Sequence, residues 1–590
     1  MQEKVVESKI CKHCWVSFEI TDKDLEFYEK VSPIFNWVKY KIPSPTLCPD
    51  CRQQRRLSFH NERSLYKRKC DITNNEIISA YAPWNFTVYE NEFWWSDKWD
   101  PMYYSKDFDF NKNFFEQFLD LSQKVPKQAL IVQEQENSNY LNFAYKIKNC
   151  YLIFASSEDE NCYYWNRINQ SKNCINCLLV KQCENCSECI WAFKCYLCFY
   201  SQNISNCSES SFLFDCEWCK NCFMCSDLKN KQFCIKNIQY SKFWYFEEIK
   251  KYENKTFLDR LSEYNRFKIS IPKKYANIQS SINCTWDNIL NAKNIKQVFD
   301  WELLEDVRYS NFVDDVKDSM DLNYWYWNTV LNYDSLWTWI NAYNIYFCIN
   351  TWPNVKSLFY CDTCVGCSNL FWCVWLKNKS YCILNKQYIK EEYEELVPKI
   401  IEHMKKTWEW WEFFPSSISP FGYNETVANE YFPVSPHPDL LPLGEGVKGI
   451  IQNNQFIPLP LGEVRWGQQI FNRSTYEAPF PKVDKIILAS KLPNNIKDIP
   501  DDILNRAIEC EITKKPFKII RQELDFYRKH NLPIPKRHPD QRHLDRMTLR
   551  NPRKLFDRKC DKCEKDIKTT YSPDRKEIVY CESCYNNSVY

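Results

Sequence analysis

Glycine is almost missing from this chain of 590 residues. There are seven glycines, where average usage near 7% predicts roughly 40, and five of the seven lie between Gly444 and Gly467. No uninterrupted apolar run approaches membrane-spanning length, and Met1 to Lys12 is too polar for a signal peptide. Since the net charge is only +2, overall charge favours no class of partner. We therefore expect a cytoplasmic protein whose 32 cysteines stay reduced.

Tryptophan stands at positions where glycine would be expected. Trp15 follows a Cys-x-x-Cys knuckle, Trp37 follows Asn, and Trp84 follows Pro, which are turn contexts. Similar positions are Trp372, Trp375, Trp408 and Trp411. We hypothesise that many of these tryptophans are UGA codons that the organism reads as glycine; the alternative is a genuinely tryptophan-rich protein. The hypothesis predicts positive φ and exposed rings at Trp15, Trp37 and Trp84, whereas the Trp94–Trp99 cluster is taken as genuine.

Two cysteine sets have the spacing of tetrahedral zinc sites. Four thiolates, supplied as two Cys-x-x-Cys pairs, complete the coordination of a structural Zn²⁺ ion. The N-terminal set is Cys11, Cys14, Cys48 and Cys51, and the C-terminal set is Cys560, Cys563, Cys581 and Cys584. The sequence therefore predicts two Zn²⁺ ions.

The two ends of the chain are copies of one module. A shift of 499 residues aligns Cys11 with Cys510, and a shift of 490 aligns 68–71 with 558–561, both Arg-Lys-Cys-Asp. Each copy would hold two zinc-site positions in tandem, here called clefts, of which one keeps its zinc ligands. At the other cleft of each copy, other residues replace three of the four cysteines. They are Thr513, His538 and Gln541 in the second copy, and Thr73, Glu90 and Phe93 in the first. We expect the leftover Cys70 and Cys510 to be packed rather than metal-bound.

The N-terminal module resembles a known family. Cys-x-x-Cys, then Phe18 and 25–28 (Leu-Glu-Phe-Tyr), then 48–52 (Cys-Pro-Asp-Cys-Arg) is similar to probable treble-clef zinc-ribbon domains of bacteria. The whole chain resembles uncharacterised proteins of small-genome uncultivated bacteria that combine such zinc clefts with a cysteine-rich middle. The resemblance implies a zinc-binding fold and no established activity.

The middle of the chain holds two cysteine-rich arrays. Residues 150–234 contain 15 cysteines, spaced first by 12 and later by 9 residues, and 284–382 form a sparser second array. A fixed short period predicts a β-solenoid with cysteines inside as small apolar residues. Iron–sulfur ligation by Cys216, Cys219, Cys222 and Cys225 is the alternative, although the spacing departs from the ferredoxin pattern. Thiol catalysis is disfavoured because no histidine occurs between His60 and His403.

Arginines follow the cleft in both modules. We predict that these side chains form basic faces that contact RNA phosphates; the alternative is a solvated surface. The candidate residues are Arg52, Arg55, Arg56, Arg63, Arg68, Arg542, Arg546, Arg553 and Arg558.

Together these patterns predict a multidomain, mainly β protein with a few helices: a two-part, cysteine-rich β-solenoid flanked by duplicated treble-clef zinc modules. The expected segments are a first module (1–100), a connector (101–140), the first array (141–240), a helical connector (241–280), the second array (281–386), a helix and connector (387–433), an inserted disordered loop (434–470) and the second module (471–590). The predicted function is a non-catalytic zinc-binding scaffold that binds RNA or a ribonucleoprotein. The alternatives are an iron–sulfur or thiol redox protein, and a protein-interaction scaffold without nucleic acid.

Overall fold

A computed structural model describes residues 3–83, 86–324, 327–433 and 485–589, with short strands between 451 and 473. The chain forms two compact units. The first comprises Met1–Leu130 with Ala276–Tyr476, and the second comprises Ile131–Tyr275 with Glu477–Tyr590. The first unit thus combines the N-terminal module with the second array, and the second unit combines the C-terminal module with the first array. Trp84 and most of the predicted insert at 434–470 lie outside the described residues.

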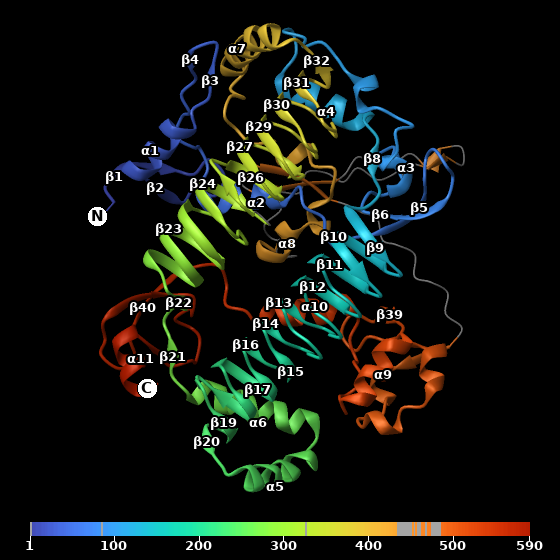
Figure 1. Ribbon diagram of the computed structural model, residues 1–590, viewed down its shortest axis with the longest axis vertical. Coiled ribbons are helices and arrows are strands. Elements are labelled where there is room, and N and C mark those ends of the chain that lie inside the picture. Colours follow the sequence, from blue (N-terminus) through green and yellow to red (C-terminus); the bar gives the residue numbers. More distant parts are fainter. Residues whose placement is uncertain are drawn as a thin grey trace. The chain divides into compact units, whose positions relative to one another are not determined.

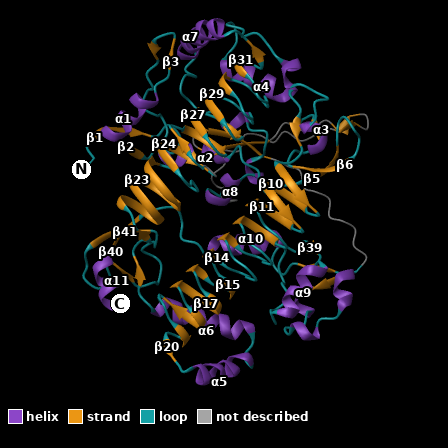
Figure 2. Ribbon diagram, viewed as in Figure 1, coloured by secondary structure: helices purple, strands orange, loops and turns teal. Residues whose placement is uncertain are grey.

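The first array is a sheet of parallel strands stacked along the chain (Figures 1 and 2). Apart from the antiparallel pair β19–β20 at its end, each strand pairs with residues 12 positions further on, as in Asn139↔Tyr151 and Tyr151↔Tyr163. The strands are β9 (Val132–Glu136), β10 (Asn139–Lys148), β11 (Tyr151–Ser157), β12 (Tyr163–Asn169), β13 (Leu178–Lys181), β14 (Ile190–Phe193), β15 (Tyr196–Phe199), β16 (Gln202–Ser205), β17 (Ser208–Glu217), β18 (Lys220–Ser226), β19 (Gln232–Ile235) and β20 (Ile238–Gln239).

The array bends at every third residue. Asn149, Leu152 and Ala155 have φ of 52°, 53° and 50°, and the pattern continues through Lys236. The residue after each bend is turned inward: Cys150 and Ile153 are buried. Asparagine tolerates this left-handed conformation better than most residues, which explains why it so often precedes cysteine.

The change of cysteine spacing from 12 to 9 is not a change of period, and that part of the prediction is wrong. Strand pairing keeps its offset of 12 to the end, as in Cys222↔Cys234. A spacing of nine equals three bends, so successive cysteines such as Cys207 and Cys216 occupy different inward positions.

The second array is also a sheet of mostly parallel strands. Its offset is 12 at Leu304↔Val316, 13 at Val316↔Thr329, and 12 again at Lys356↔Ser368. The strands are β22 (Ile278–Gln279), β23 (Ile282–Arg308), β24 (Val316–Asn323), β25 (Thr329–Val330), β26 (Tyr333–Thr338), β27 (Ala342–Tyr346), β28 (Ile349–Thr351), β29 (Val355–Phe359), β30 (Ser368–Phe371), β31 (Ser380–Ile383) and β32 (Lys386–Gln387).

Both arrays end in the same way. A two-residue turn reverses the chain into a short antiparallel strand, β20 or β32. The turn asparagines Asn237 and Asn385 then bond to the backbone N–H and C=O of Ser226 and Val374. This closure satisfies backbone groups at the sheet end. Helices α5 (Lys242–Glu253) and α6 (Phe257–Ser270) follow the first array, and α7 (Lys390–Lys406) follows the second, as the sequence predicts.

Outside the arrays, both units consist of short hairpins and helices. In the first unit these are β1 (Val5–Ile10), β2 (Ser17–Thr21), α1 (Asp22–Val31), β3 (Ile34–Phe35), β4 (Val38–Lys39), α2 (Pro49–Leu57), β5 (Tyr66–Lys69), β6 (Glu76–Ser79), β7 (Val88–Tyr89), α3 (Asn91–Trp95), α4 (Phe114–Lys124), β8 (Lys127–Gln128), α8 (Val427–Tyr431), β33 (Ile451–Gln452), β34 (Gln455–Phe456), β35 (Gly462–Trp466) and β36 (Gln469–Arg473). In the second unit they are β21 (Lys273–Lys274), β37 (Ile486–Leu488), β38 (Ala507–Glu509), β39 (Pro516–Phe517), α9 (Arg521–Lys529), α10 (Pro539–Thr548), β40 (Phe556–Lys559), β41 (Asp566–Thr569), β42 (Val579–Tyr580) and α11 (Glu582–Val589).

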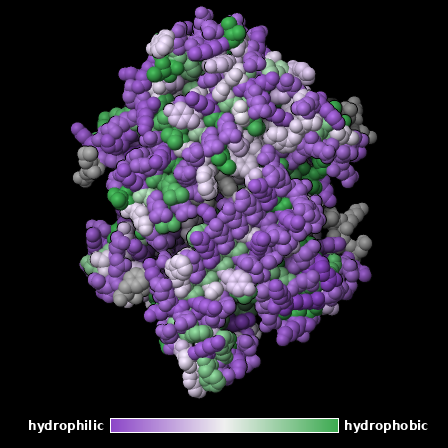
Figure 3. All heavy atoms as spheres, in the orientation of Figure 1, coloured by the Kyte–Doolittle hydropathy of each residue, from purple (hydrophilic) through white to green (hydrophobic). Residues whose placement is uncertain are grey.

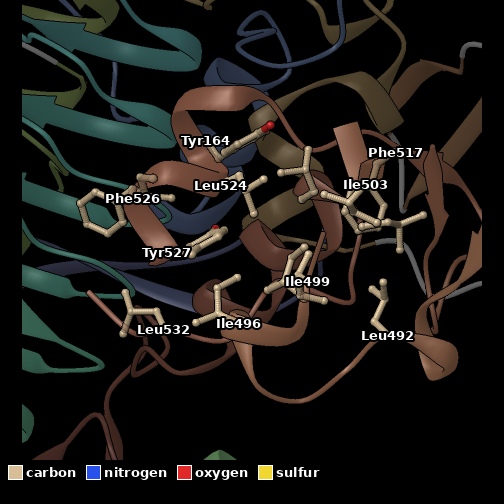
Figure 4. Close-up of a cluster of buried hydrophobic side chains, with 14 of the residues drawn as sticks. Tyr164, Leu492, Ile496, Ile499, Ile503, Phe517, Leu524, Phe526, Tyr527 and Leu532 are labelled. Carbon is tan, nitrogen blue, oxygen red and sulfur yellow. The ribbon is translucent and has the colours of Figure 1, made fainter. Parts of the chain in front are cut away.

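The first half of the C-terminal module has its own hydrophobic core, shown in Figure 4. Ile499, Leu524 and Tyr527 lie in it, and Tyr164 of the first array packs against it. The core of this half of the module therefore includes side chains of the first array.

Several tryptophans have the left-handed backbone that the glycine hypothesis predicts. Trp15 (φ 63°) and Trp37 (φ 64°) both hold their rings in solvent, with Trp37 96% exposed. Trp37 follows Asn36 (φ 45°) in the two-residue turn between β3 and β4, a turn that strongly prefers Asn-Gly. Outside the arrays, four of the nine described non-glycine residues with positive φ are tryptophan: Trp15, Asn36, Trp37, Asn74, Trp408, Trp411, Lys514, Asn531 and Glu564.

Four described tryptophans combine positive φ with burial: Trp337, Trp372, Trp375 and Trp411. Trp372 (φ 69°) and Trp375 (φ 61°) lie in the second array, where every third residue has this conformation. Trp372 stacks on Phe114 at 3.7 Å between ring centroids, and Trp375 contacts Trp94 at 4.8 Å. Their backbone fits glycine, but their rings have packing partners, so the prediction of solvent-exposed rings does not extend to them.

Candidate metal centres

The structure brings the four N-terminal cysteines together. Cys11 and Cys14 lie in the turn between β1 and β2, Cys48 is the N-cap of α2, and Cys51 lies in its first turn. The four sulfur atoms lie within 4.8 Å of one another. The Cys48 N–H donates to the Cys11 sulfur at 3.3 Å, which orients the helix terminus toward the cluster. Three of the four side chains are buried.

The C-terminal cysteines repeat this arrangement in a more open setting. Cys560 and Cys563 lie between β40 and β41, and Cys581 immediately precedes α11, which contains Cys584. Again the sulfur atoms lie within 4.8 Å of one another, and the Cys581 N–H donates to the Cys560 sulfur at 3.2 Å. Here Cys563 is exposed. Within the described residues, these two tetrads are the groups whose donor atoms could hold a metal ion.

The same turn occurs four times, including at the two incomplete sites, which keep one cysteine each. The fourth residue after the first cysteine donates its N–H to the cysteine carbonyl and has φ near 60°; these residues are Trp15, Asn74, Lys514 and Glu564. In the incomplete clefts Cys70 and Cys510 are buried. The Glu90 N–H donates to the Cys70 sulfur at 3.3 Å. The incomplete sites therefore keep the turn seen at the two tetrads, although each retains only one cysteine sulfur.

Each tetrad contains thiols of unequal acidity. A hydrogen bond from the Cys51 thiol lowers the pKa of Cys48 to about 5, and one from the Ser583 hydroxyl lowers the pKa of Cys581 to about 6. Burial raises the pKa of Cys14 to about 11. Close sulfur atoms share protons in this way, and a cation that binds there replaces those protons and favours four thiolates.

The arginines of the N-terminal module do not form an exposed basic face. Arg52 and Arg56 are buried in α2, which packs against β24 and β26 of the second array. The Arg52 Nε lies 2.9 Å from an Asp321 carboxylate oxygen, and an Arg56 nitrogen lies 2.5 Å from Asp334. Arg55 is also buried and pairs with Asp334. The prediction that these three arginines contact phosphate is therefore wrong, because carboxylates of the array already neutralise their guanidinium groups.

The C-terminal module uses its arginines in the same way. Arg542, the counterpart of Arg52, is buried and pairs with Glu523 at 2.9 Å. It also donates to the side-chain oxygen of Asn176 in the first array at 3.1 Å. Arg546, the counterpart of Arg56, is buried and lies 3.3 Å from Glu188 of the array. A buried charge is strongly destabilising without a partner, so folding alone accounts for the duplicated arginines.

Arg68 and Arg558 each brace a loop of their own module. Arg68 pairs with Asp71 at 2.8 Å, and Arg558 pairs with Asp561 at 3.1 Å. Each aspartate also accepts a backbone N–H at 2.6 Å, from Val88 or Val579. Arg63 and Arg553 are half-buried. The exposed basic side chains near these arginines are lysines, among them Lys67, Lys69, Lys554 and Lys559.

Inside the arrays, cysteine serves as a hydrogen-bonding group for the backbone. The Cys186 N–H donates to the Cys174 sulfur at 3.2 Å, and the Cys174 thiol lies 2.9 Å from the Lys172 carbonyl. Serine does the same where it replaces cysteine: the Cys183 N–H donates to the Ser171 hydroxyl at 3.1 Å. The described array cysteines do not group as metal ligands. This placement gives the iron–sulfur alternative no support.

Sequence reasoning found the tetrads but missed the acidic residues that bind the arginines. Their partners Asp321 and Asp334 lie far along the chain and have no local signature. Comparison with family models, curated proteins and solved structures finds no match. Among the described residues, no helix is both long and apolar enough to cross a membrane.

Proposed function

We propose that this protein is a non-catalytic zinc scaffold. The observation that carries the proposal is the pair of four-cysteine clusters, each formed by a hairpin turn and a helix N-terminus. Four thiolates in a tetrahedron favour Zn²⁺, and two strands, a knuckle and a helix that supplies ligands are the parts of a treble clef. Either ion would fix a hairpin to a helix rather than take part in a reaction, because four protein ligands leave no open position.

We further propose that the two sheets are walls of a β-solenoid. Parallel pairing at a near-constant offset of 12 residues, with a bend at every third residue, supports this architecture. None of the 32 cysteines is in a disulfide, which fits a reducing compartment such as the cytoplasm.

Metal analysis of cysteine variants tests the zinc sites. The purified protein should contain two zinc ions and no visible absorption band. Cys11→Ser with Cys48→Ser should leave one ion, and so should Cys560→Ser with Cys581→Ser. Cys70→Ser is the matched control and should keep both ions, because this cleft has one sulfur. A coloured protein with iron, or zinc content unchanged by the tetrad variants, would contradict the proposal.

RNA binding through the modules stays a prediction. The buried arginines do not support it, but the exposed Lys67 and Lys69 on β5 face solvent and could contact phosphates. Fluorescence anisotropy with a single-stranded RNA at low salt is the test. Lys67→Glu with Lys69→Glu should weaken binding and flatten its dependence on salt. Absence of binding by the wild-type protein would leave a scaffold that acts through protein contacts alone.

A further inference from the structure

The C-terminal tetrad lies between two contacts that attach its module to the first array. Strand β42 ends directly before Cys581 and pairs in parallel with β21 (Lys273–Lys274), here called the strap. Helix α11 carries Tyr585 directly after Cys584, and the Tyr585 hydroxyl donates to an Asp227 carboxylate oxygen of the array at 2.6 Å. Both contacts are therefore made by residues adjacent to the tetrad.

The strap carries a buried charge into the end of the array. The Lys273 Nζ lies 2.9 Å from an Asp227 carboxylate oxygen and 2.7 Å from the Ser226 hydroxyl. The side chains of Lys273 and Asp227 are each 1% exposed. Asp227 thus binds the strap and α11 at one carboxylate. Because a buried charge is costly once its partner leaves, the strap and α11 should release together.

The half of the module that holds this tetrad has a small hydrophobic core. Among the described residues, its buried cluster consists of Cys560, Ile567, Tyr571, Val579 and Cys581. Two of these residues belong to the tetrad. Figure 3 shows mainly hydrophilic residues where Figure 1 places α11 and the β40–β41 hairpin. In so small a fold, the free energy of metal binding is also folding free energy.

The N-terminal module makes the same contact at its incomplete cleft. Strand β7 pairs in parallel with β8, as β42 pairs with the strap. Trp94 in α3 directly follows Phe93, as Tyr585 in α11 directly follows Cys584. This contact therefore forms at a cleft that keeps one cysteine of four.

Tryptophan packing holds α3 where the ligands are missing. Trp94 is buried, and its ring centroid lies 5.0 Å from that of Trp95 and 5.5 Å from that of Trp99. The Lys377 Nζ of the second array lies 3.9 Å from a Trp94 ring centroid and donates to the Trp94 carbonyl at 2.6 Å. Aromatic pairs and cation–π contacts stabilise beyond the area that they bury. The C-terminal module has the smaller Tyr585 at this position and depends on its tetrad instead.

We propose that metal at the C-terminal tetrad acts as a latch for the strap, an inference that rests on the proposed zinc sites. With the ion bound, the tetrad keeps β42 and Tyr585 in register for the strap and Asp227. When the ion is removed, both contacts release and water reaches the Lys273–Asp227 pair. Because Cys563 is exposed, a competing metal-binding compound can reach this site, so the latch responds to the free zinc concentration. The N-terminal contact, held by tryptophan, does not respond.

Hydrogen exchange of the full chain with and without metal tests the latch. The Lys273 N–H donates to the Ile578 carbonyl at 2.7 Å, and the Tyr275 N–H donates to the Tyr580 carbonyl at 3.0 Å. Chelation should speed exchange at these two amides roughly tenfold or more, and added zinc should restore slow exchange. Cys563→Ser with Cys584→Ser should have the same effect without a chelator.

The N-terminal contact supplies matched control amides. The Lys127 N–H donates to the Thr87 carbonyl at 2.8 Å, and the Ala129 N–H donates to the Tyr89 carbonyl at 3.0 Å. Exchange at Lys127 and Ala129 should not change in the Cys563→Ser, Cys584→Ser variant. Cys11→Ser with Cys48→Ser, which removes the other proposed ion, should leave the strap amides slow.

The coupling should also appear in zinc affinity, because linkage between two equilibria is reciprocal. Tyr585→Phe removes the hydrogen bond to Asp227 and keeps all four cysteines. The C-terminal site of this variant should bind zinc roughly three- to tenfold more weakly, as measured by competition with a zinc-sensitive dye. Tyr240→Phe, elsewhere in the same unit, should not change the affinity.

The outcomes separate the latch from the zinc sites themselves. If Cys563→Ser with Cys584→Ser removes no zinc, both the proposed function and the latch are wrong. Zinc loss that leaves the strap amides slow overturns the latch alone. Equal acceleration at Lys127 and Ala129 does so too, as does a Tyr585→Phe variant that binds zinc as tightly as the wild type.

Discussion

Replacing Trp37 by glycine should stabilise the β3–β4 hairpin. A left-handed backbone costs an L-residue roughly 1–2 kcal/mol, and Trp37 has φ 64° in a turn built for Asn-Gly. The ring is 96% exposed, so its removal loses almost no burial. Glycine also gives the unfolded chain more conformational freedom, which reduces this stabilisation by about 0.4–1 kcal/mol. The net gain should be about 1 kcal/mol.

Hydrogen exchange of this hairpin can measure the gain. The Tyr40 N–H donates to the Pro33 carbonyl at 2.9 Å and closes the hairpin. A local gain of about 1 kcal/mol should slow its exchange about fivefold. Trp37→Ala removes the same ring but keeps the Cβ, so it should not slow exchange. Equal exchange in the glycine and alanine variants would refute the argument that backbone strain matters here.

The remaining predictions concern metal release, buried charge and the array core. A chelator should remove zinc in two phases, the faster from the C-terminal tetrad because Cys563 is exposed, as followed with a zinc-sensitive dye. Asp334→Asn should cost about 3–5 kcal/mol by leaving buried arginines underpaired, which should lower the urea midpoint, whereas Arg506→Ala in an exposed pair should leave it unchanged. Cys174→Ser should be tolerated, while Cys174→Val should cost about 1–3 kcal/mol because the Cys186 N–H loses its acceptor; thermal melts would separate the two.

Local spacing is what made the two cysteine tetrads predictable. Cys11 and Cys14 belong to one turn, and Cys48 and Cys51 to one helix terminus, so the pattern of ligands is visible in short segments. The duplication supplied a second example with complementary losses. The array period of 12 was also visible, but the later spacing of 9 misled because cysteine can occupy several inward positions within one 12-residue repeat.

The arginines show where sequence reasoning stops. Arg52 and Arg56 look the same in sequence whether they face phosphate or carboxylate. The deciding residues are Asp321 and Asp334, which reach α2 only after the array has folded. Retention of the charges in both copies suggested RNA, yet Arg546 lies 3.3 Å from Glu188 of the first array, as its counterpart Arg56 lies 2.5 Å from Asp334 of the second. The shared cause is the docking of a helix against an array.

The docking of α2 also sets an order of events during synthesis. The Arg52–Asp321 pair joins residues 269 positions apart, and ribosomes add roughly 5–20 residues per second. The N-terminal module therefore waits roughly 15–50 s before its carboxylate partners exist. The C-terminal module meets the opposite situation, since Arg542 reaches Asn176, made 366 residues earlier. One end of the protein is thus completed by strands synthesised after it, while the other end finds its binding surface already in place when it leaves the ribosome.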